Sequence, residues 1–298
     1  MLLILQQVFV LYIFIFFGWL LGRLNKKLPD HSSIFSFFMV NLFLPCKIFR
    51  TLSQQFTIED LQSKWVFLLI SVAMLLCLHF LSKLPAKALA KDDGERRVYE
   101  YSLTITNYGY MGYALVESVF GADVLSDMIF FCIPFSIYTY TVGYLKLTNR
   151  KPSPKRLCNP MTIAIALGLS AGVLNIRLPQ PITQVFSSAA NCTGPISMLL
   201  VGLVLSSFDV KNLFSHKSDY LLIALRLVIL PLLVFSVCKL LGLHNVLAPA
   251  LFVCAMPTGL NTIVFTQGTD TSPEIGARLA FLSHIASCVT LPLWLSII

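Results

Sequence analysis

The sequence is short of charge. Only 12% of its 298 residues are Asp, Glu, Lys or Arg, whereas soluble globular proteins carry about 25%. Hydrophobic residues make up 56% of the chain, and the mean hydropathy is +0.78. These values exclude a soluble enzyme, a disordered regulator and a nucleic-acid-binding domain. They indicate an integral membrane protein with little mass outside the bilayer.

Motifs that would mark other functions are also missing. The eight cysteines form no C-x-x-C pair and lie mostly in apolar runs, so we interpret them as packing residues. No His, Cys and Asp cluster has metal-ligand spacing, and neither a Ser, His and Asp order nor a Walker motif is present. We therefore expect no enzyme, no nucleic-acid partner and no cofactor beyond a coupling proton or sodium ion.

Long apolar runs are what the sequence has instead. A membrane-crossing helix needs about 20 mostly apolar residues. Ten stretches qualify, namely 2–22, 32–52, 65–83, 98–121, 125–146, 160–177, 183–207, 218–241, 246–268 and 277–298. No loop between them is long enough to fold alone, so we expect an all-α integral membrane protein with one membrane domain. The first run has no basic residue before Arg23 and is too long for a signal peptide.

The basic residues lie mainly on one side of these ten spans. The loops after odd-numbered spans hold sixteen of them: Arg23, Lys26, Lys27, Lys83, Lys87, Lys91, Arg96, Arg97, Lys146, Arg150, Lys151, Lys155, Arg156, Lys211, Lys217 and Arg278. The opposite side holds four: Arg50, Lys64, Arg177 and Lys239. The positive-inside rule places the richer side in the cytoplasm. We therefore expect a multi-pass protein of the cell (plasma or inner) membrane with both termini extracytoplasmic.

The polar, Pro-rich loop 147–160 divides the spans five and five. Because five is odd, the second half must enter the membrane inverted relative to the first, as in inverted-repeat transporters. We therefore assign residues 1–150 to a first five-helix repeat and residues 157–298 to a second, inverted one.

Spans four and nine collect Gly, Asn and Thr in mid-span, in the sequences TITNYGYMG (104–112) and CAMPTGLNT (254–262). Pro257 should break span nine, and Gly109 and Gly112 ease unwinding of span four. Freed backbone groups must then line a cavity, and the N–H groups of Thr258, Gly259 and Leu260 would suit an anion. The alternative is two kinked helices whose small residues allow close packing.

Five motifs carry a family resemblance: FLPCKIF in span two, TNYGYMGYAL in span four, GPISMLLVGLVL in span seven, AMPTGLNTIVFTQ in span nine and SHIASCVTLPLW in span ten. With them the chain resembles the auxin efflux carrier family in its short bacterial form. The resemblance implies ten helices, a scaffold part and a transport part, and broken fourth and ninth helices that cross. It also implies elevator-type transport of organic anions such as auxin, malonate or other carboxylates. The family shares its fold with bile-acid sodium symporters, so coupling of transport to sodium is an alternative that the resemblance implies.

One position departs from the family. The family commonly has a proline two residues after the span-four glycine, where this chain has Ala114. The break in span four is therefore expected to be softer than the break in span nine.

The candidate substrate-binding residues lie mostly in these two spans. They are Asn107, Tyr108, Gly109, Tyr110, Gly112, Pro257, Thr258, Gly259 and Asn261, with Asn41 and Lys47 added from span two. Asn107, Gly112, Pro257 and Gly259 are carried over from the resemblance. Asn107 and Asn261 are both expected to line a central cavity, because each has an amide that can donate to a carboxylate.

Ionisable residues at membrane depth are candidates for function by default. Lys47 either pairs with a carboxylate substrate or extends its ammonium group to the headgroups. Arg226 is expected to pair with helix C-terminal carbonyls or a carboxylate. Glu117 either binds a coupling ion or sits at the interface, and His79 and His284 are interpreted as packing residues.

Together these features predict a secondary transporter of a small organic anion that works by elevator-type alternating access. A sodium-coupled symporter, a channel and a membrane enzyme are the alternatives. The cargo, the direction and the coupling ion stay open, as does assembly into a homodimer.

The predicted topology can be tested with a single cysteine at Ser153 in a cysteine-free background. Because the basic loop should be cytoplasmic, a membrane-impermeant reagent should label this cysteine only after the cells are broken. Labelling in intact cells would contradict the topology.

Overall fold

A computed structural model of the chain describes residues 2–150, 158–209, 214, 216–266, 269, 271 and 273–298. Within these ranges the secondary structure is helical apart from one isolated β-bridge. Residues 151–157 of the predicted linker lie outside the described residues, as does Ser153.

The first half of the chain forms helices in the order expected from its apolar runs. They are α1 (Leu2–Leu24), η1 (Pro29–His31), α2 (Ser32–Phe38), η2 (Met39–Phe43), α3 (Leu44–Gln55), α4 (Ile58–Leu81), α5 (Lys83–Leu89), α6 (Asp93–Thr104), η3 (Tyr108–Gly112), α7 (Tyr113–Phe120), α8 (Ala122–Phe131), α9 (Ile133–Tyr138), η4 (Thr139–Gly143) and α10 (Tyr144–Thr148). Of these, η2, η3 and η4 are π-helical.

The described part of the second half is likewise helical. Its helices are α11 (Pro160–Val173), α12 (Gln180–Asn191), α13 (Thr193–Ser206), α15 (Lys217–Ala224), π-helical η6 (Leu225–Ile229), α16 (Leu230–Leu240), α17 (His244–Ala255), α18 (Asn261–Val264) and α19 (Pro273–Leu295).

Six helices of the described chain are long and apolar enough to cross a membrane, or seven if the bent pair α8 to α10 counts as one span. The predicted spans 98–121, 160–177 and 246–268 are not among them. Span 98–121 is interrupted between α6 and η3, and α11 and α17 are shorter apolar helices. The ten-span count therefore stays a prediction.

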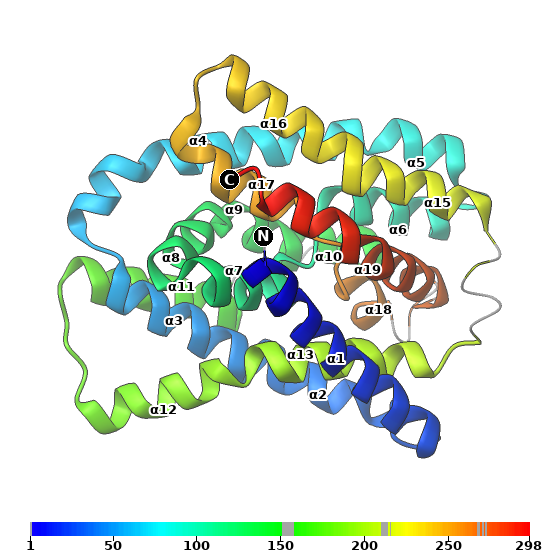
Figure 1. Cartoon of the computed structure of the whole chain (residues 1–298), viewed down its shortest axis with the longest axis horizontal. Coiled ribbons are helices and arrows are strands. Elements are labelled where there is room, and N and C mark those ends of the chain that lie inside the picture. Colours follow the sequence, from blue (N-terminus) through cyan, green and yellow to red (C-terminus); the bar gives the residue numbers. More distant parts are fainter. Residues whose placement is uncertain are drawn as a thin grey trace.

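The helices pack in two groups. In the first, α1 packs along α13, and α3 packs against α11 and α12. Glycines make these contacts close, since a Cβ on Gly202 would overlap the carbonyl oxygen of Ile15 and one on Gly172 would overlap that of Phe56. We call α1–α3 and α11–α13 the support group, and α4–α10 and α15–α19 the crossing group. Helices α1, α2, α3, α12 and α13 fill the lower part of the view in Figure 1, and α4, α5, α15 and α16 lie along its upper edge.

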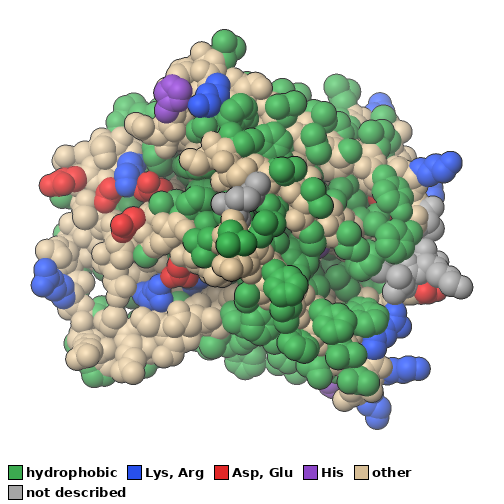
Figure 2. Space-filling view, in the orientation of Figure 1, with side chains coloured by type: hydrophobic (Ala, Val, Ile, Leu, Met, Phe, Trp, Pro, Cys, Tyr) green, Lys and Arg blue, Asp and Glu red, His purple; other side chains and the backbone are tan. Residues whose placement is uncertain are grey.

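The outer surface is strongly apolar. Large hydrophobic side chains are exposed along α1, α4 and α16, including Phe9 at 66%, Leu69 at 58% and Leu240 at 85%. Figure 2 shows hydrophobic side chains gathered across the middle of one face, whereas most charged side chains lie toward its left and right sides. An apolar belt between two charged margins is the surface that a bilayer requires.

Candidate functional site

Two broken helices meet in the interior of the crossing group. Helix α6 ends at Thr104 and α17 ends at Ala255, and the chain then becomes extended at Ile105 and Met256. Thr106 and Thr258 form an antiparallel β-bridge, and the Asn107 N–H donates to the Pro257 carbonyl oxygen at 2.8 Å. The interruptions predicted in spans four and nine are therefore present, and the two breaks cross.

Local chemistry explains the break after α17. Pro257 has no N–H, so the carbonyl of Val253, four residues earlier, loses its helical partner. The Thr106 hydroxyl donates to that carbonyl at 2.9 Å. Glycine also eases the close approach, because a Cβ on Gly259 would make a tight contact of 3.1 Å with the Thr106 carbonyl oxygen. Residues 105–107 separate α6 from η3, whereas residues 256–260 separate α17 from α18.

Arg226 joins the two broken helices at their C-terminal ends. Its guanidinium donates to the carbonyl oxygens of Leu103 in α6 and Val253 in α17, each at 3.4 Å. The residue is 0% exposed and forms no ion pair among the described residues. Each helix C-terminus carries about half a negative charge, so the two ends together balance the guanidinium. This is the carbonyl pairing that the sequence predicted.

A small cavity of about 20 Å³ lies between the two groups of helices. It is lined by Leu44 and Ile48 of α3, Met161 of α11, and Thr106, Tyr108, Gly109, Tyr110, Tyr113, Ser136, Thr139, Tyr140 and Asn261 of the crossing group. A water molecule needs about 10–15 Å³ by this measure, so the cavity has room for one water. In this conformation it is too small for an organic anion.

Four of the predicted residues thus line the cavity: Tyr108, Gly109, Tyr110 and Asn261. The Tyr110 hydroxyl donates to Asn261 Oδ1 at 3.4 Å. This bond uses the amide oxygen of Asn261 and leaves the amide nitrogen as the group that can donate to a carboxylate.

Asn107 is not among the residues that line the cavity, whereas Asn261 is, although both were expected there. Its Nδ2 lies 3.1 Å from His284 Nε2, and His284 Nδ1 lies 2.6 Å from the Ala280 carbonyl oxygen. A carbonyl only accepts, so Nδ1 carries the proton and Nε2 accepts from the Asn107 amide. The Asn107 amide nitrogen is therefore bonded within the protein, and His284 is not the isolated side chain that the sequence suggested.

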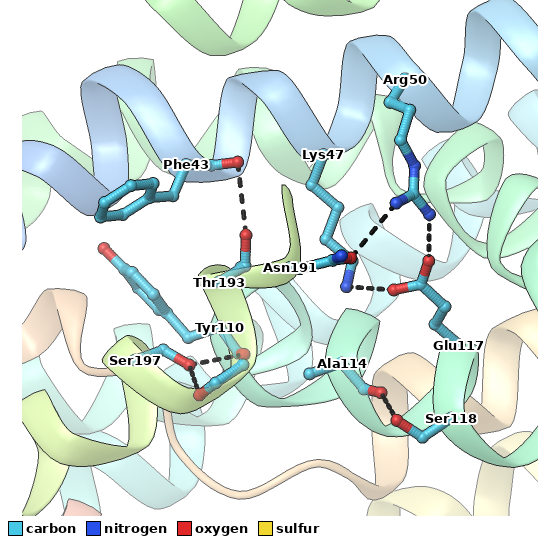
Figure 3. Close-up of polar contacts among 11 residues, drawn as sticks. Phe43, Lys47, Arg50, Tyr110, Ala114, Glu117, Ser118, Asn191, Thr193 and Ser197 are labelled. Carbon is cyan, nitrogen blue, oxygen red and sulfur yellow. Dashed lines mark hydrogen bonds and ion pairs between the residues drawn. The ribbon is translucent and has the colours of Figure 1, made fainter. Parts of the chain in front are cut away.

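The two span-two candidates also lie away from the cavity. Asn41 is exposed, and its amide donates to the Phe37 carbonyl within the same helix. Lys47 is 2% exposed and forms an ion pair with Glu117 at 2.5 Å, and Arg50 pairs with the same carboxylate (Figure 3). Of the two alternatives for Lys47, extension to the headgroups does not occur, because its ammonium group is paired inside the protein. Pairing with a carboxylate substrate stays a prediction.

The remaining candidates have mainly structural contacts. The Thr258 N–H, expected to face an anion, donates to Ser283 Oγ at 3.1 Å. Gly112 packs against Met128 and Met256. Sequence reasoning missed Ser136 and Thr139, whose hydroxyls lie 3.2 Å and 3.4 Å from the Tyr108 hydroxyl. Both are small polar residues within the apolar run 125–146, and this feature of the sequence could have marked them as cavity residues.

Comparison with known proteins identifies the class. The sequence model of a family described as membrane transport protein matches residues 3–155 and 153–295. The chain therefore belongs to this family, the auxin efflux carrier family that its motifs resemble.

Relatives of similar length are named as transporters. An uncharacterized transporter of Methanothermobacter thermautotrophicus is 22% identical over 97% of this chain and 96% of its own. A protein of Rhizobium meliloti named "Putative malonate transporter" is 22% identical over 92% and 91%. The uncharacterized transporter YfdV of Escherichia coli is 20% identical over 93% and 92%. The protein is thus a membrane transporter of this family.

Replacing Arg226 by Met should destabilise the protein, because the Leu103 carbonyl loses its guanidinium partner and two helix C-termini lose their balancing charge. An unsatisfied buried polar group costs about 1–3 kcal/mol. The check is denaturant or thermal unfolding in detergent, with Lys239→Met of the neighbouring α16 as the matched control. Equal stability of the two variants would contradict the assigned role.

Proposed function

We propose that this transporter is a secondary carrier of a small organic anion and that its binding site is the cavity beside the crossing. The observation that carries the proposal is the hydrogen-bonded crossing of two interrupted helices, with a small, partly polar cavity between two groups of helices. Irregular backbone at membrane depth is tolerated only where it is buried in protein or lines a cavity.

The packing pattern supports a 5+5 inverted repeat of residues 1–150 and 157–298. The first predicted span packs on the seventh, as α1 on α13, and the sixth packs on the second, as α11 on α3. In a 5+5 repeat, span one corresponds to span six and span two to span seven. The contact between spans one and seven therefore corresponds to the contact between spans six and two. The crossing of the fourth and ninth spans has the same property.

The cavity has the chemistry of an anion site. The first hydrogen bond of η3 starts at the Met111 N–H, so the N–H groups of Tyr108, Gly109 and Tyr110 precede it and point from a positive helix end. The Asn261 amide adds a further donor. The four tyrosines around the cavity favour a cargo with a small apolar or flat part.

A carboxylate cargo fits this chemistry and is the class named for the Rhizobium meliloti relative. Because the cavity holds only about one water, the cargo enters only after the two groups separate. We assign this movement to elevator-type alternating access, with the crossing group sliding against the support group. A channel fits this arrangement less well than a carrier, since the pathway of a channel need not be closed between two groups of helices.

Arg226 bears on the coupling ion. In carriers with broken helices, half-helix C-terminal ends and unwound carbonyls are the groups that coordinate sodium. Here the Leu103 and Val253 carbonyls are already bonded to a guanidinium. A fixed internal cation in this place favours a carrier that does not need sodium.

Replacing Asn261 by Leu should weaken binding of the cargo at least about tenfold, because a carboxylate loses a hydrogen-bond donor inside a closed cavity. A screen of mono- and dicarboxylates by thermal shift identifies the ligand, and its titration gives the affinity. Asn41→Leu is the matched control, since Asn41 is exposed and lies away from the cavity. Wild-type affinity in Asn261→Leu would refute the assigned site.

A further inference from the structure

A cluster of three charged side chains joins the two groups of helices. Lys47 and Arg50 extend from α3 of the support group to the carboxylate of Glu117 on α7 of the crossing group (Figure 3). The Lys47 Nζ lies 2.5 Å from Glu117 Oε2, and Arg50 contacts Oε1. Arg50 also donates to Asn191 Oδ1 of α12 at 3.4 Å.

Lys47 and Glu117 of this cluster line a hollow of about 290 Å³ that shares no residue with the cavity at the crossing. Arg50 is not itself a lining residue and reaches the hollow through its contacts with Glu117 and Asn191. The polar lining of the hollow consists of Gln7, Lys47, Glu117, Ser118 and Asn191. Lys47 and Ile48 are neighbours on α3 but line different spaces, because successive helical residues point about 100° apart. The volume is sufficient for a small dicarboxylate, since pockets for larger, drug-sized ligands start at about 300 Å³.

The charges of the cluster do not balance. Two cations share one carboxylate, and the lining residues from α1, α12 and α13 carry no charge. The Lys47 and Arg50 side chains are 3% and 15% exposed, whereas that of Glu117 is 25% exposed. The cations are thus the buried part of the cluster, and the carboxylate is its accessible part. Burying the Lys47 and Arg50 cations is costly unless they are paired, and any carboxylate in the place of Glu117 would supply that pairing.

We propose that the hollow is a second carboxylate-binding site, in which Glu117 occupies the place of the ligand until a carboxylate exchanges with it on Lys47 and Arg50. Because Glu117 belongs to the crossing group and the two cations belong to the support group, the exchange also releases an ion pair between them. The anion class rests on the proposed function, whereas the exchange itself rests on the charge cluster.

The test is a malonate titration of purified protein in detergent, followed by thermal unfolding at constant ionic strength with chloride as the replaced anion. Glu117→Gln removes the competing carboxylate and keeps the shape. The half-maximal malonate concentration should fall at least about tenfold, as expected from the loss of one charge-assisted competitor. Adding Lys47→Met to this variant should abolish the gain.

Asp127→Asn is the matched control. Asp127 of α8 pairs with Lys64 of α4 at 2.6 Å within the crossing group, so its removal should lower stability without increasing the response to malonate. An unchanged midpoint in Glu117→Gln would overturn the proposal, and stabilisation by sulfate equal to that by malonate would overturn its assignment to carboxylates.

If Glu117→Gln does not fold without ligand, refolding in malonate but not in chloride supports the proposal. If it folds in neither, the test uses Arg50→Gln, which leaves Glu117 in place. The half-maximal malonate concentration of this variant should be about tenfold higher than that of the wild type. An unchanged midpoint would overturn the site.

Adding Asn261→Leu separates this proposal from the proposed function. If the Glu117→Gln, Asn261→Leu double variant still binds malonate, the second site is supported, even if the cavity at the crossing binds no malonate. If Asn261→Leu alone abolishes malonate binding and Glu117→Gln has no effect, the proposed carrier function is supported and the second site is rejected.

Discussion

Two helix C-termini face each other inside this protein, and Arg226 lies between them. Without a positive group there, the carbonyls of Leu103 and Val253 would meet as two partial negative charges in a medium of low dielectric. The guanidinium donates to both through its two terminal nitrogens, and these two carbonyls offset part of the cost of burying it. The crossing of the two breaks, with the Thr106–Thr258 bridge, depends on this arrangement.

The rest of the site follows from the crossing. Because α6 and α17 both stop at the crossing, Tyr110 of η3 and Asn261 of α18 line one cavity together with residues of α3 and α11. The support group presents a mostly apolar surface to it, through Leu44, Ile48 and Met161. Under the proposed function, the groups that bind the cargo would come from the crossing group and the covering surface from the support group, which is the division that alternating access needs.

Some of this could be predicted from the sequence, since it follows from local chemistry. The apolar runs indicate helices, Pro257 marks the break in its own helix, and a deep arginine needs carbonyl or carboxylate partners. The orientation of Asn107 could not be predicted, because its backbone (φ −81°, ψ 38°) is not helical and helical periodicity does not apply there. Asn41 lies in the π-helical segment η2, which likewise changes the face on which a residue falls.

Contacts between distant segments could not be predicted either. Glu117 is 70 residues from Lys47 and 67 from Arg50, and nothing in the local pattern of either helix selects this pairing. The role of His284 was missed for the same reason, since its partner Asn107 is 177 residues away. Such pairs are decided by how the two groups of helices pack.

The most direct test of this account is uptake of a labelled carboxylate, identified by the ligand screen, into proteoliposomes with sodium replaced by potassium at equal ionic strength. The account predicts uptake that depends on the protein and is the same in both salts, because Arg226 already provides the cation between the broken helices. Uptake that requires sodium, or no uptake of any carboxylate that binds, would contradict it.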